Sequence, residues 1–423
     1  ERAMQNNKGW NRRAFLGAAG LTVMGARLVR GSEANSAVRV GLLGCGGRGT
    51  ADATSMMVNA GARVTALGDL FHDQLDRARK HFDELAEKQG VAAIDAGQIF
   101  RGPRAFEQIA QSKEVDAVVI ATPPYYHPQH LEAMVEAGKH VYCEKPVAVD
   151  VPGTRRVLAA GQKAEGRVSL EVGFQIRQAP PFVELVKRIH AGALGEISFG
   201  AAYYYCPFLE APHPDAPPAE WRLRNWLYDR VLSGDIIVEQ NIHAIDICNW
   251  VLQGHPVKAS GVGGRKGRPD PGDVYGHCAV SFWYPNDVHV SFASKQFGTG
   301  AFDVSERFFG ARGESQSPYS GPLGITGDEN WTWAGSEKKQ DGQFSAAGTF
   351  ADNLAEADAE KHKSFIGSIM SGAFHNQAAT GVESSLSAML GRMAMYTGRE
   401  VTWDELVRSE ESWDAKLDLE KLG

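Results

Sequence analysis

A glycine-rich turn near the start of the chain constrains its fold more than any other feature. The turn follows an apolar run at residues 38–43, typical of a buried parallel strand, and precedes residues 50–59, which have a helical pattern. It reads Gly44-Cys45-Gly46-Gly47-Arg48-Gly49. In such a unit the first glycine permits the tight turn, the second lets the backbone approach a pyrophosphate, and the last lets helix pack on strand. The context predicts a dinucleotide site, with the phosphates at the start of the helix.

An aspartate after the next predicted strand indicates which dinucleotide is bound. Residues 63–68 are expected to form that strand, and Asp69 lies twenty residues beyond Gly49. A carboxylate there accepts hydrogen bonds from the ribose hydroxyls and repels a 2′-phosphate, so we expect NAD rather than NADP. The alternative is an ordinary glycine turn beside a surface aspartate.

Strand-like and helical segments alternate up to about residue 173. Strands are predicted at 115–121, 140–143 and 168–172, and helices at 130–137 and 152–165. Such alternation is typical of a parallel, doubly wound sheet, whose ligands lie beyond the carboxyl ends of the strands. Two motifs follow strand ends and are expected to face the cofactor: Thr122-Pro123-Pro124 and Glu144-Lys145-Pro146.

The second half has the pattern of a different sheet. Strands are predicted at 198–205, 257–263, 277–283, 288–294 and 306–310, with a hairpin turn at 285–287. Helices are expected at 355–371 and 383–396, and long loops at 207–220 and 313–352. The expected fold class is α/β: a Rossmann domain with a doubly wound parallel sheet over residues 37–174, then a substrate-binding and oligomerisation domain over 175–423. The second domain should contain a large, mostly antiparallel open sheet.

The first 36 residues have the pattern of an export signal. Asn11-Arg12-Arg13-Ala14-Phe15-Leu16 is a twin-arginine pattern, and the following weakly apolar run to residue 29 contains no acid. At about fifteen residues, broken by Arg27, the run is too short and too polar for a stable membrane span. We expect a twin-arginine signal and linker over residues 1–36, and a periplasmic or otherwise exported protein. A disordered basic tail is the alternative.

Charge and cysteine content narrow the classes of partner and site. The formal net charge is −7 and no basic stripe offsets it, which argues against a nucleic-acid partner. The five cysteines show neither a C-x-x-C pair nor metal-type spacing, so we interpret them as small buried hydrophobic residues.

Lys145 and a polar stripe on one predicted helix are the candidates for chemistry. The Lys145 ammonium could stabilise an alkoxide beside the nicotinamide, although a surface lysine is the alternative. Residues 235–252 are expected to form one helix with Glu239, His243 and Asp246 on one face. No Lys or Arg occurs from 231 to 257, so this stripe is expected to line a cleft, with His243 as the proton acceptor. An interior hydrogen-bonded histidine is one alternative. A metal site is another, but there is no third neutral ligand and no metal is expected.

An aromatic cluster follows the Pro-rich segment. Its members are Trp221, Trp226 and Tyr228, with Arg222, Arg224 and Asn225 among them. Such side chains suit stacking against a sugar ring, and ordinary packing is the alternative.

Taken together, these residues resemble the glucose–fructose oxidoreductase, inositol dehydrogenase and MocA family. The resemblance covers almost everything after residue 37. It rests on the glycine turn, Asp69, Ala121-Thr122-Pro123-Pro124 with His127, Glu144-Lys145-Pro146, Gly173-Phe174-Gln175-Ile176-Arg177, the segment 239–246 and Tyr396-Thr397-Gly398-Arg399-Glu400. It implies a Rossmann domain followed by an open α/β domain whose sheet often makes the dimer contact, hence a homodimer or homotetramer.

The resemblance also implies roles for individual residues. Lys145, His243 and Glu239 are the expected catalytic residues. Cofactor contacts are expected from Gly44, Gly46, Gly47, Arg48, Gly49, Asp69, Thr122, Pro123, Pro124, His127, Glu144 and Lys145. Substrate contacts are expected from Gln175, Arg177, Trp226 and Asp246. The family commonly shows Asp-x-Gly-x-His-x-x-Asp, whereas this chain has Glu239 and Asn241 at the first and third positions, which leaves the substrate open.

The expected function is that of an exported NAD-dependent oxidoreductase acting on a hydroxyl of a sugar, polyol or sugar derivative. Twin-arginine transport carries folded proteins, and a compartment without an NAD pool favours a tightly bound, recycled cofactor. One alternative is an NAD-dependent glycosidase that oxidises its sugar transiently and eliminates the leaving group. Another is a non-catalytic exported protein that binds NAD or carbohydrate.

Overall fold

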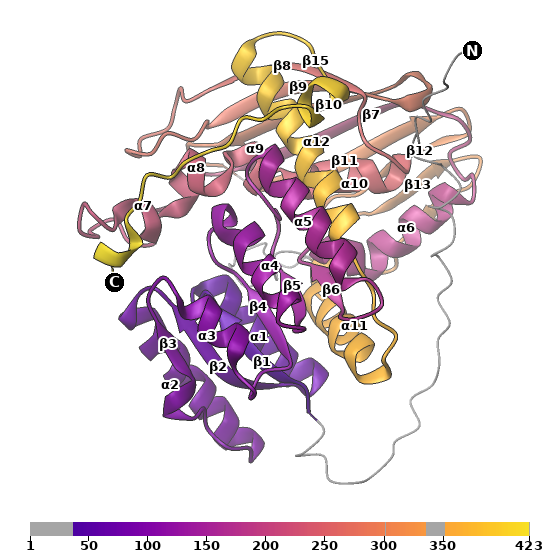
Figure 1. Ribbon diagram of the computed structural model, residues 1–423. Helices are drawn as coiled ribbons and strands as arrows, with labels where there is room; N and C mark the ends of the chain where they lie inside the picture. The colour runs from indigo at the N-terminus through magenta and orange to yellow at the C-terminus, as the bar shows by residue number, and fades with distance from the viewer. Residues whose placement is uncertain (1–36, 301, 336–351, 423) are drawn as a thin grey trace, which may run out of the picture. The chain divides into compact units, whose positions relative to one another are not determined.

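The apolar run before the glycine turn forms the central region of a parallel sheet in the computed structural model, which describes residues 37–300, 302–335 and 352–422 (Figure 1). Six strands follow the order β3-β2-β1-β4-β5-β6, and all their pairings are parallel. They are β1 (Arg39–Leu43), β2 (Arg63–Asp69), β3 (Ile99–Arg101), β4 (Ala117–Ile120), β5 (His140–Cys143) and β6 (Leu170–Val172). The predicted doubly wound parallel sheet is confirmed.

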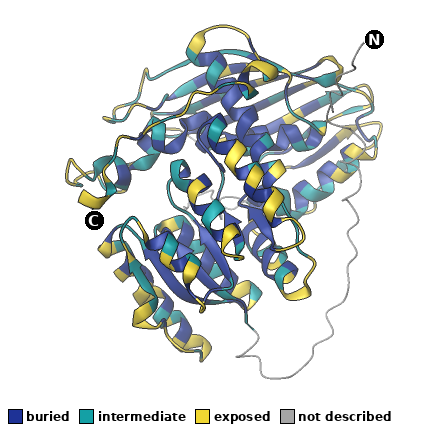
Figure 2. Cartoon of the chain, in the orientation of Figure 1, coloured by how far each residue is buried: buried dark blue, intermediate teal, exposed yellow. Residues whose placement is uncertain are grey.

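Helices cover both faces of this sheet. They are α1 (Gly47–Ala60), α2 (His72–Gln89), α3 (Ala105–Gln111), α4 (His127–Glu136) and α5 (Val151–Ala164). Along β4, Val119 belongs to one apolar cluster, whereas Val118 and Ile120 belong to another, as the two-residue period of a strand requires. Figure 2 shows the buried strands between helices whose outer faces are exposed.

A second sheet of nine strands is built from the rest of the chain. Its order is β14-β13-β12-β11-β7-β10-β9-β8-β15, and only the pair β10–β7 is parallel. The strands are β7 (Ile197–Cys206), β8 (Lys258–Gly264), β9 (His277–Tyr284), β10 (Val288–Gln296), β11 (Asp303–Gly310), β12 (Gly313–Gln316), β13 (Gly324–Gly327), β14 (Trp331–Thr332) and β15 (Val401–Thr402). The predicted mostly antiparallel sheet and its turn at 285–287 are confirmed.

The prediction of a continuous loop at 313–352 is wrong in its described part. It contains β12, β13 and β14, which extend the sheet from β11. These strands are short and hold few apolar residues, so their pairing depends on the backbone of β11 rather than on a local hydrophobic pattern.

Helices α6 (Pro180–His190), α10 (Ile242–Leu252) and α12 (Ala378–Thr397) contribute buried side chains to the same large cluster as the second sheet (Figure 1). Helix α11 (Ala357–Ser371), which comes late in the chain, lies instead against α1. Its Phe365 and Ile366 join the apolar cluster of Val40 and Met56. The nucleotide-binding sheet is therefore covered partly by residues from the far end of the sequence.

The single helix predicted over 235–252 is wrong. Two helices, α9 (Ile236–Glu239) and α10, meet at Gln240 and Asn241. The N–H of Asn241 donates to the carbonyl oxygen of Ile236, five residues back, and this wider turn interrupts the regular helix. The side chains on either side of the break therefore do not share one helix face.

None of the helices that the structure describes is long and apolar enough to cross a membrane. The twin-arginine pattern and the predicted signal over residues 1–36 lie outside the described residues.

Candidate active site

The glycine turn leaves room where a pyrophosphate is expected. Gly44 has φ +94°, and a Cβ added at Gly49 would lie 2.2 Å from the Gly44 carbonyl oxygen, so both positions require glycine. A Cβ at Gly46 would meet no described atom within 4 Å. Helix α1 begins at Gly47, and no described side chain caps its N-terminus. Its first N–H groups are therefore free to bind an anion, which fits a dinucleotide phosphate.

Two neighbouring cavities of about 440 and 240 Å³ lie on either side of the glycine turn. Gly46, Gly47 and Thr122 border both of them. The larger cavity is lined by Lys145, Glu239 and His243, and the smaller one by Asp69. This arrangement fits NAD, with its adenosine half near Asp69 and its nicotinamide half toward Lys145.

Asp69 ends β2 and lies directly under the glycine turn. One carboxylate oxygen accepts a hydrogen bond from the Cys45 N–H at 2.7 Å, and the other accepts one from the Phe71 N–H at 2.9 Å. Burial raises the pKa of Asp69, and these two N–H groups oppose that rise. Each oxygen retains a further acceptor position for a ribose hydroxyl.

The position of Asp69 carries the first prediction. Asp69→Ala should remove the ribose contact and the repulsion of a 2′-phosphate, and so narrow the preference for NAD over NADP by about tenfold or more, which corresponds to about 1.4 kcal/mol. Titration of both cofactors by intrinsic fluorescence measures the ratio. Equal affinities for NAD and NADP in the unaltered protein would contradict the role given to Asp69.

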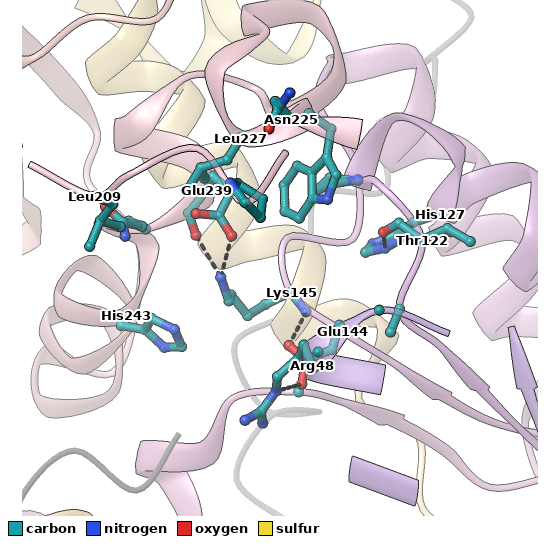
Figure 3. Close-up of a pocket in the computed structure, with 18 of the residues that line it drawn as sticks. Arg48, Thr122, His127, Glu144, Lys145, Leu209, Asn225, Leu227, Glu239 and His243 are labelled. Carbon is teal, nitrogen blue, oxygen red and sulfur yellow. Dashed lines mark hydrogen bonds and ion pairs between the residues drawn. The ribbon is translucent and has the colours of Figure 1, made fainter. Parts of the chain in front are cut away.

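Lys145 and Glu239 form an ion pair inside the larger cavity (Figure 3). The Lys145 Nζ donates to both the backbone carbonyl oxygen and Oε1 of Glu239, each at 2.8 Å. The two side chains are only 12% and 9% exposed. The motif after β5 and the end of α9 are thus held together, which brings two of the expected catalytic residues, Lys145 and Glu239, into contact.

His243 lies in the first turn of α10 and lines the same cavity. Burial and, after it, the charge of Lys145 lower the pKa of His243 well below its usual value. The imidazole is therefore neutral at neutral pH, which is the form that accepts a proton.

Glu144 and Arg48 contact each other (Figure 3). The carboxylate of Glu144 accepts hydrogen bonds from Arg48 Nε and the Tyr142 hydroxyl, both at 3.0 Å, and from the Lys145 N–H at 3.2 Å. Arg48 also forms a bidentate pair with Asp358 at 2.9 and 3.0 Å. Burial raises the pKa of Glu144, but Arg48 and Lys361 outweigh it and hold that pKa well below its usual value. The Glu144 carboxylate thus orients the Lys145 backbone.

His127 joins the two strand-end motifs. Its ring nitrogens lie 2.7 Å from the carbonyl oxygens of Pro146 and Thr122. Thr122 borders both cavities, Pro123 borders the smaller one, and Pro124 borders the larger one together with His127. These residues therefore form the wall between the two cavities.

The four predicted substrate residues divide into two pairs. Gln175 lines the larger cavity and Trp226 lines both, where a substrate contact remains a prediction. Arg177 and Asp246 line neither of the two cavities; they bind each other at 2.8–3.1 Å, and Asp246 also accepts a hydrogen bond from the Ser384 hydroxyl at 2.6 Å. The predicted substrate contacts are thus not supported for this pair. The Asp246 carboxylate is instead held by Arg177 and Ser384, which lie away from the cavity linings.

Several lining residues lack a signal in the sequence. They are Tyr204, Leu209, Glu210, Pro212, Leu227, Gln240 and Tyr319. Four of them come from the Pro-rich segment or the residues after it, whose course over the cavity depends on distant parts of the chain. Tyr319 lies in the region predicted as a loop. Only the position of Gln240 beside Glu239 could have suggested a role.

The amide of Gln240 is oriented by its neighbours. Arg268 Nη1 donates to Gln296 Oε1 at 2.5 Å, and Gln296 Nε2 donates in turn to Gln240 Oε1. Because a guanidinium can only donate, it fixes the orientation of both amides. Gln240 is therefore left with its nitrogen as a hydrogen-bond donor.

The glycine turn, the ribose-side aspartate and a lysine–glutamate pair that shares a cavity with a neutral histidine define a class: an NAD-dependent oxidoreductase acting on CH–OH groups. The chain belongs to the Gfo/Idh/MocA family. Residues 38–172 match the oxidoreductase family with the NAD-binding Rossmann fold, and residues 182–316 match the GFO/IDH/MocA C-terminal domain. The resemblance inferred from the motifs is confirmed.

Individual proteins are similar to this chain over most of its length. The inositol 2-dehydrogenase of Rhizobium meliloti (strain 1021) is 27% identical over 339 residues, which cover 79% of this chain and 90% of that protein. Two crystal structures share the fold. The scyllo-inositol dehydrogenase from Lactobacillus casei with bound NAD(H) and scyllo-inositol has a TM-score of 0.66 and 19% identity, over 87% of this chain and 99% of that one. The aldose–aldose oxidoreductase from Caulobacter crescentus complexed with glycerol has a TM-score of 0.67 and 19% identity, over 86% and 99%.

Proposed function

We propose that the protein oxidises a hydroxyl of an uncharged sugar, polyol or sugar derivative. The observation that carries the proposal is the neutral His243 in the same buried cavity as the Lys145–Glu239 ion pair. Bound NAD supplies the hydride acceptor for such a reaction. The name of the relative from Rhizobium meliloti, an inositol 2-dehydrogenase, supports a polyol as substrate.

The three residues have complementary tasks. Neutral His243 accepts the proton of the reacting hydroxyl. An ammonium has three N–H donors, of which Lys145 gives two to Glu239, so the third remains for the substrate oxygen. The Glu239 carboxylate and carbonyl oxygen fix the direction of the Lys145 ammonium, so that it is already in place when negative charge develops on the substrate oxygen.

The charges around the cavity favour an uncharged substrate. Its lining includes the cations Arg48, Lys145 and Arg224, and each has a carboxylate partner within 3.0 Å. A phosphate or carboxylate would therefore meet no unpaired Lys or Arg among the described residues of the lining. The Gln240 nitrogen offers a donor that suits a neutral hydroxyl or ring oxygen.

Substrate panels test this proposal. The full-length protein with NAD should form NADH with members of a panel of neutral inositols, aldoses and anhydrosugars, and should be inactive with their phosphorylated counterparts. A preference for the phosphorylated sugars would contradict the charge argument. Release of a leaving group from a glycoside without net NADH would instead identify the NAD-dependent glycosidase.

The lowered pKa of His243 sets the pH dependence of the reaction. Activity requires the neutral imidazole, so kcat/KM for oxidation rises as pH rises through the pKa of His243, which lies below about 6.5. Between pH 6.5 and 8 we expect no loss from protonation of this group. Lys145→Met removes a charge that lowers this pKa, so the NMR titration of His243 should move to higher pH. If the titration of His243 did not move in this variant, the charge of Lys145 would not be a cause of the lowered pKa of His243.

We further propose export by the twin-arginine route, on the basis of the pattern around Arg12 and Arg13. Replacing both arginines with lysine should leave the protein in the cytoplasm, which cell fractionation with an antibody measures. Secretion that survives the double change would contradict the route.

Retention of the cofactor is a proposal linked to export. Protein purified without added NAD should carry it, with a dissociation constant of micromolar or below, which corresponds to about −8 kcal/mol. Mass spectrometry of the denatured protein identifies the released cofactor.

We also propose a homodimer or homotetramer formed through the second sheet. The side chains of Phe199 and Val262 on this sheet are 41% and 66% exposed, and light scattering of the purified protein tests the assembly.

A further inference from the structure

The smaller cavity is closed on its far side by residues from the second half of the chain. Pro212, Arg224 and Trp226 border both cavities, opposite the glycine turn. Leu419, near the C-terminal end, borders the smaller cavity. Three of these residues thus border both cavities, and none of the four belongs to the Rossmann sheet or its helices. We call these four residues the clasp.

Arg224 connects the clasp to the Rossmann half. It ends α7 (Trp221–Arg224), and its two terminal nitrogens donate to the two carboxylate oxygens of Asp73 at 3.0 and 3.3 Å. Asp73 lies in the first turn of α2, four residues after Asp69. The guanidinium also lies over the ring of Phe71, 3.8 Å from its centre. The contact therefore joins the two walls beside the expected ribose position.

Apolar contacts support the same junction. Phe71 belongs to a buried cluster with Leu223, Leu232 and Ala415. Trp226 and Leu419 of the clasp pack against this cluster. The segment after β2, the segment around α7 and the C-terminal segment thus meet at one place. A molecule in the smaller cavity is enclosed by all three.

We propose that the clasp retains the adenosine half of NAD, and that Arg224 is the positioning residue that holds the clasp against Asp73. The proposal rests on the proposed function insofar as NAD is the molecule enclosed. A bidentate guanidinium–carboxylate pair stacked on an aromatic ring is stronger than an ordinary surface ion pair. Asp73 is half exposed, however, so the pair can open and be screened by salt. The cofactor then leaves at the rate at which this contact opens.

Release of NADH from the full-length protein tests the clasp. Preformed complex is mixed with excess NAD, and the loss of NADH fluorescence gives the dissociation rate. Arg224→Met keeps the apolar stem over Phe71 and removes the charge, whereas Asp73→Asn changes the partner at a half-exposed position that tolerates substitution. Each should accelerate release by about tenfold, and the double variant should release no faster than Arg224→Met, because the contact between Arg224 and Asp73 is the one that both changes break. Arg224 also pairs with Glu220 within its own segment, at 2.5 Å, and Asp73→Asn leaves that pair in place.

A matched control uses the same aspartate. Arg77 also pairs with Asp73, at 3.1 Å, but it lies on the same helix α2 and lines neither cavity. Arg77→Met should leave the release rate unchanged, and rising salt should accelerate release in the unaltered protein but not in Arg224→Met.

Results that contradict the clasp differ from results that contradict the proposed function. Unaltered release in Arg224→Met and Asp73→Asn, or additive effects in the double variant, would overturn the clasp. Fast release in Arg224→Met alone would overturn it too, because Arg224 would then act on the cofactor directly. An unaltered protein that does not bind NADH at all would refute the proposed function instead.

Discussion

His243→Ala should lower turnover by about 10² or more, because the variant lacks the neutral imidazole that accepts the hydroxyl proton. The variant should still bind NADH. Lys145→Ala should have an effect of similar size, since it removes the donor that remains for the substrate oxygen. Steady-state kinetics measures the loss of turnover, and NADH titration by fluorescence measures whether the cofactor still binds.

Controls for these variants come from exposed positions on α6. His190→Ala and Lys187→Ala should retain full turnover, because both side chains lie outside the two cavities. Turnover of the His243→Ala or Lys145→Ala variant within about threefold of the unaltered protein would remove that residue from the mechanism.

Gly46→Ala and Gly49→Ala should have opposite effects on binding and stability. A Cβ at Gly46 meets open space in the described structure, so the variant should fold normally but lose NADH affinity by about a hundredfold, or about 2.8 kcal/mol. A Cβ at Gly49 would lie 2.2 Å from the Gly44 carbonyl oxygen, so this variant should lose about 1–3 kcal/mol of unfolding free energy.

Thermal unfolding and NADH titration of both glycine variants measure the difference. If Gly46→Ala bound NADH normally, the pyrophosphate would lie elsewhere than before α1. If Gly49→Ala unfolded at the temperature of the unaltered protein, the close approach of helix and strand would not limit stability.

Short-range patterns account for what the sequence predicted well. The strand, turn and helix around residues 38–60 depend on glycines and apolar residues within a few positions of each other, and their geometry follows from that order. The strands of the second sheet with alternating burial, such as β7 and β9, were predictable for the same reason. Lys145 follows the end of a parallel strand, where ligands of such sheets bind, and it lines the larger cavity.

Long-range contacts account for the features that the sequence could not predict. Asp246 faces Ser384, more than a hundred residues away, and no local pattern distinguishes this orientation from one toward the cavity. The helix break at Asn241 depends on a backbone hydrogen bond that helical periodicity does not indicate. The same holds for the pairing of β12 with β11 and for the course of the Pro-rich segment over the cavity. Both depend on residues that are distant in the sequence and become neighbours only in the folded protein.

The position of α11 has a consequence for the order in which the chain can fold. Phe365 and Ile366 complete the apolar face of the first sheet, and Asp358 pairs with Arg48 across 310 residues of sequence. During synthesis the nucleotide-binding half therefore remains unfinished, with that face uncovered, until the last quarter of the chain has left the ribosome. We therefore expect the Rossmann sheet and the cofactor turn to reach their final form late in assembly, rather than as an early N-terminal domain.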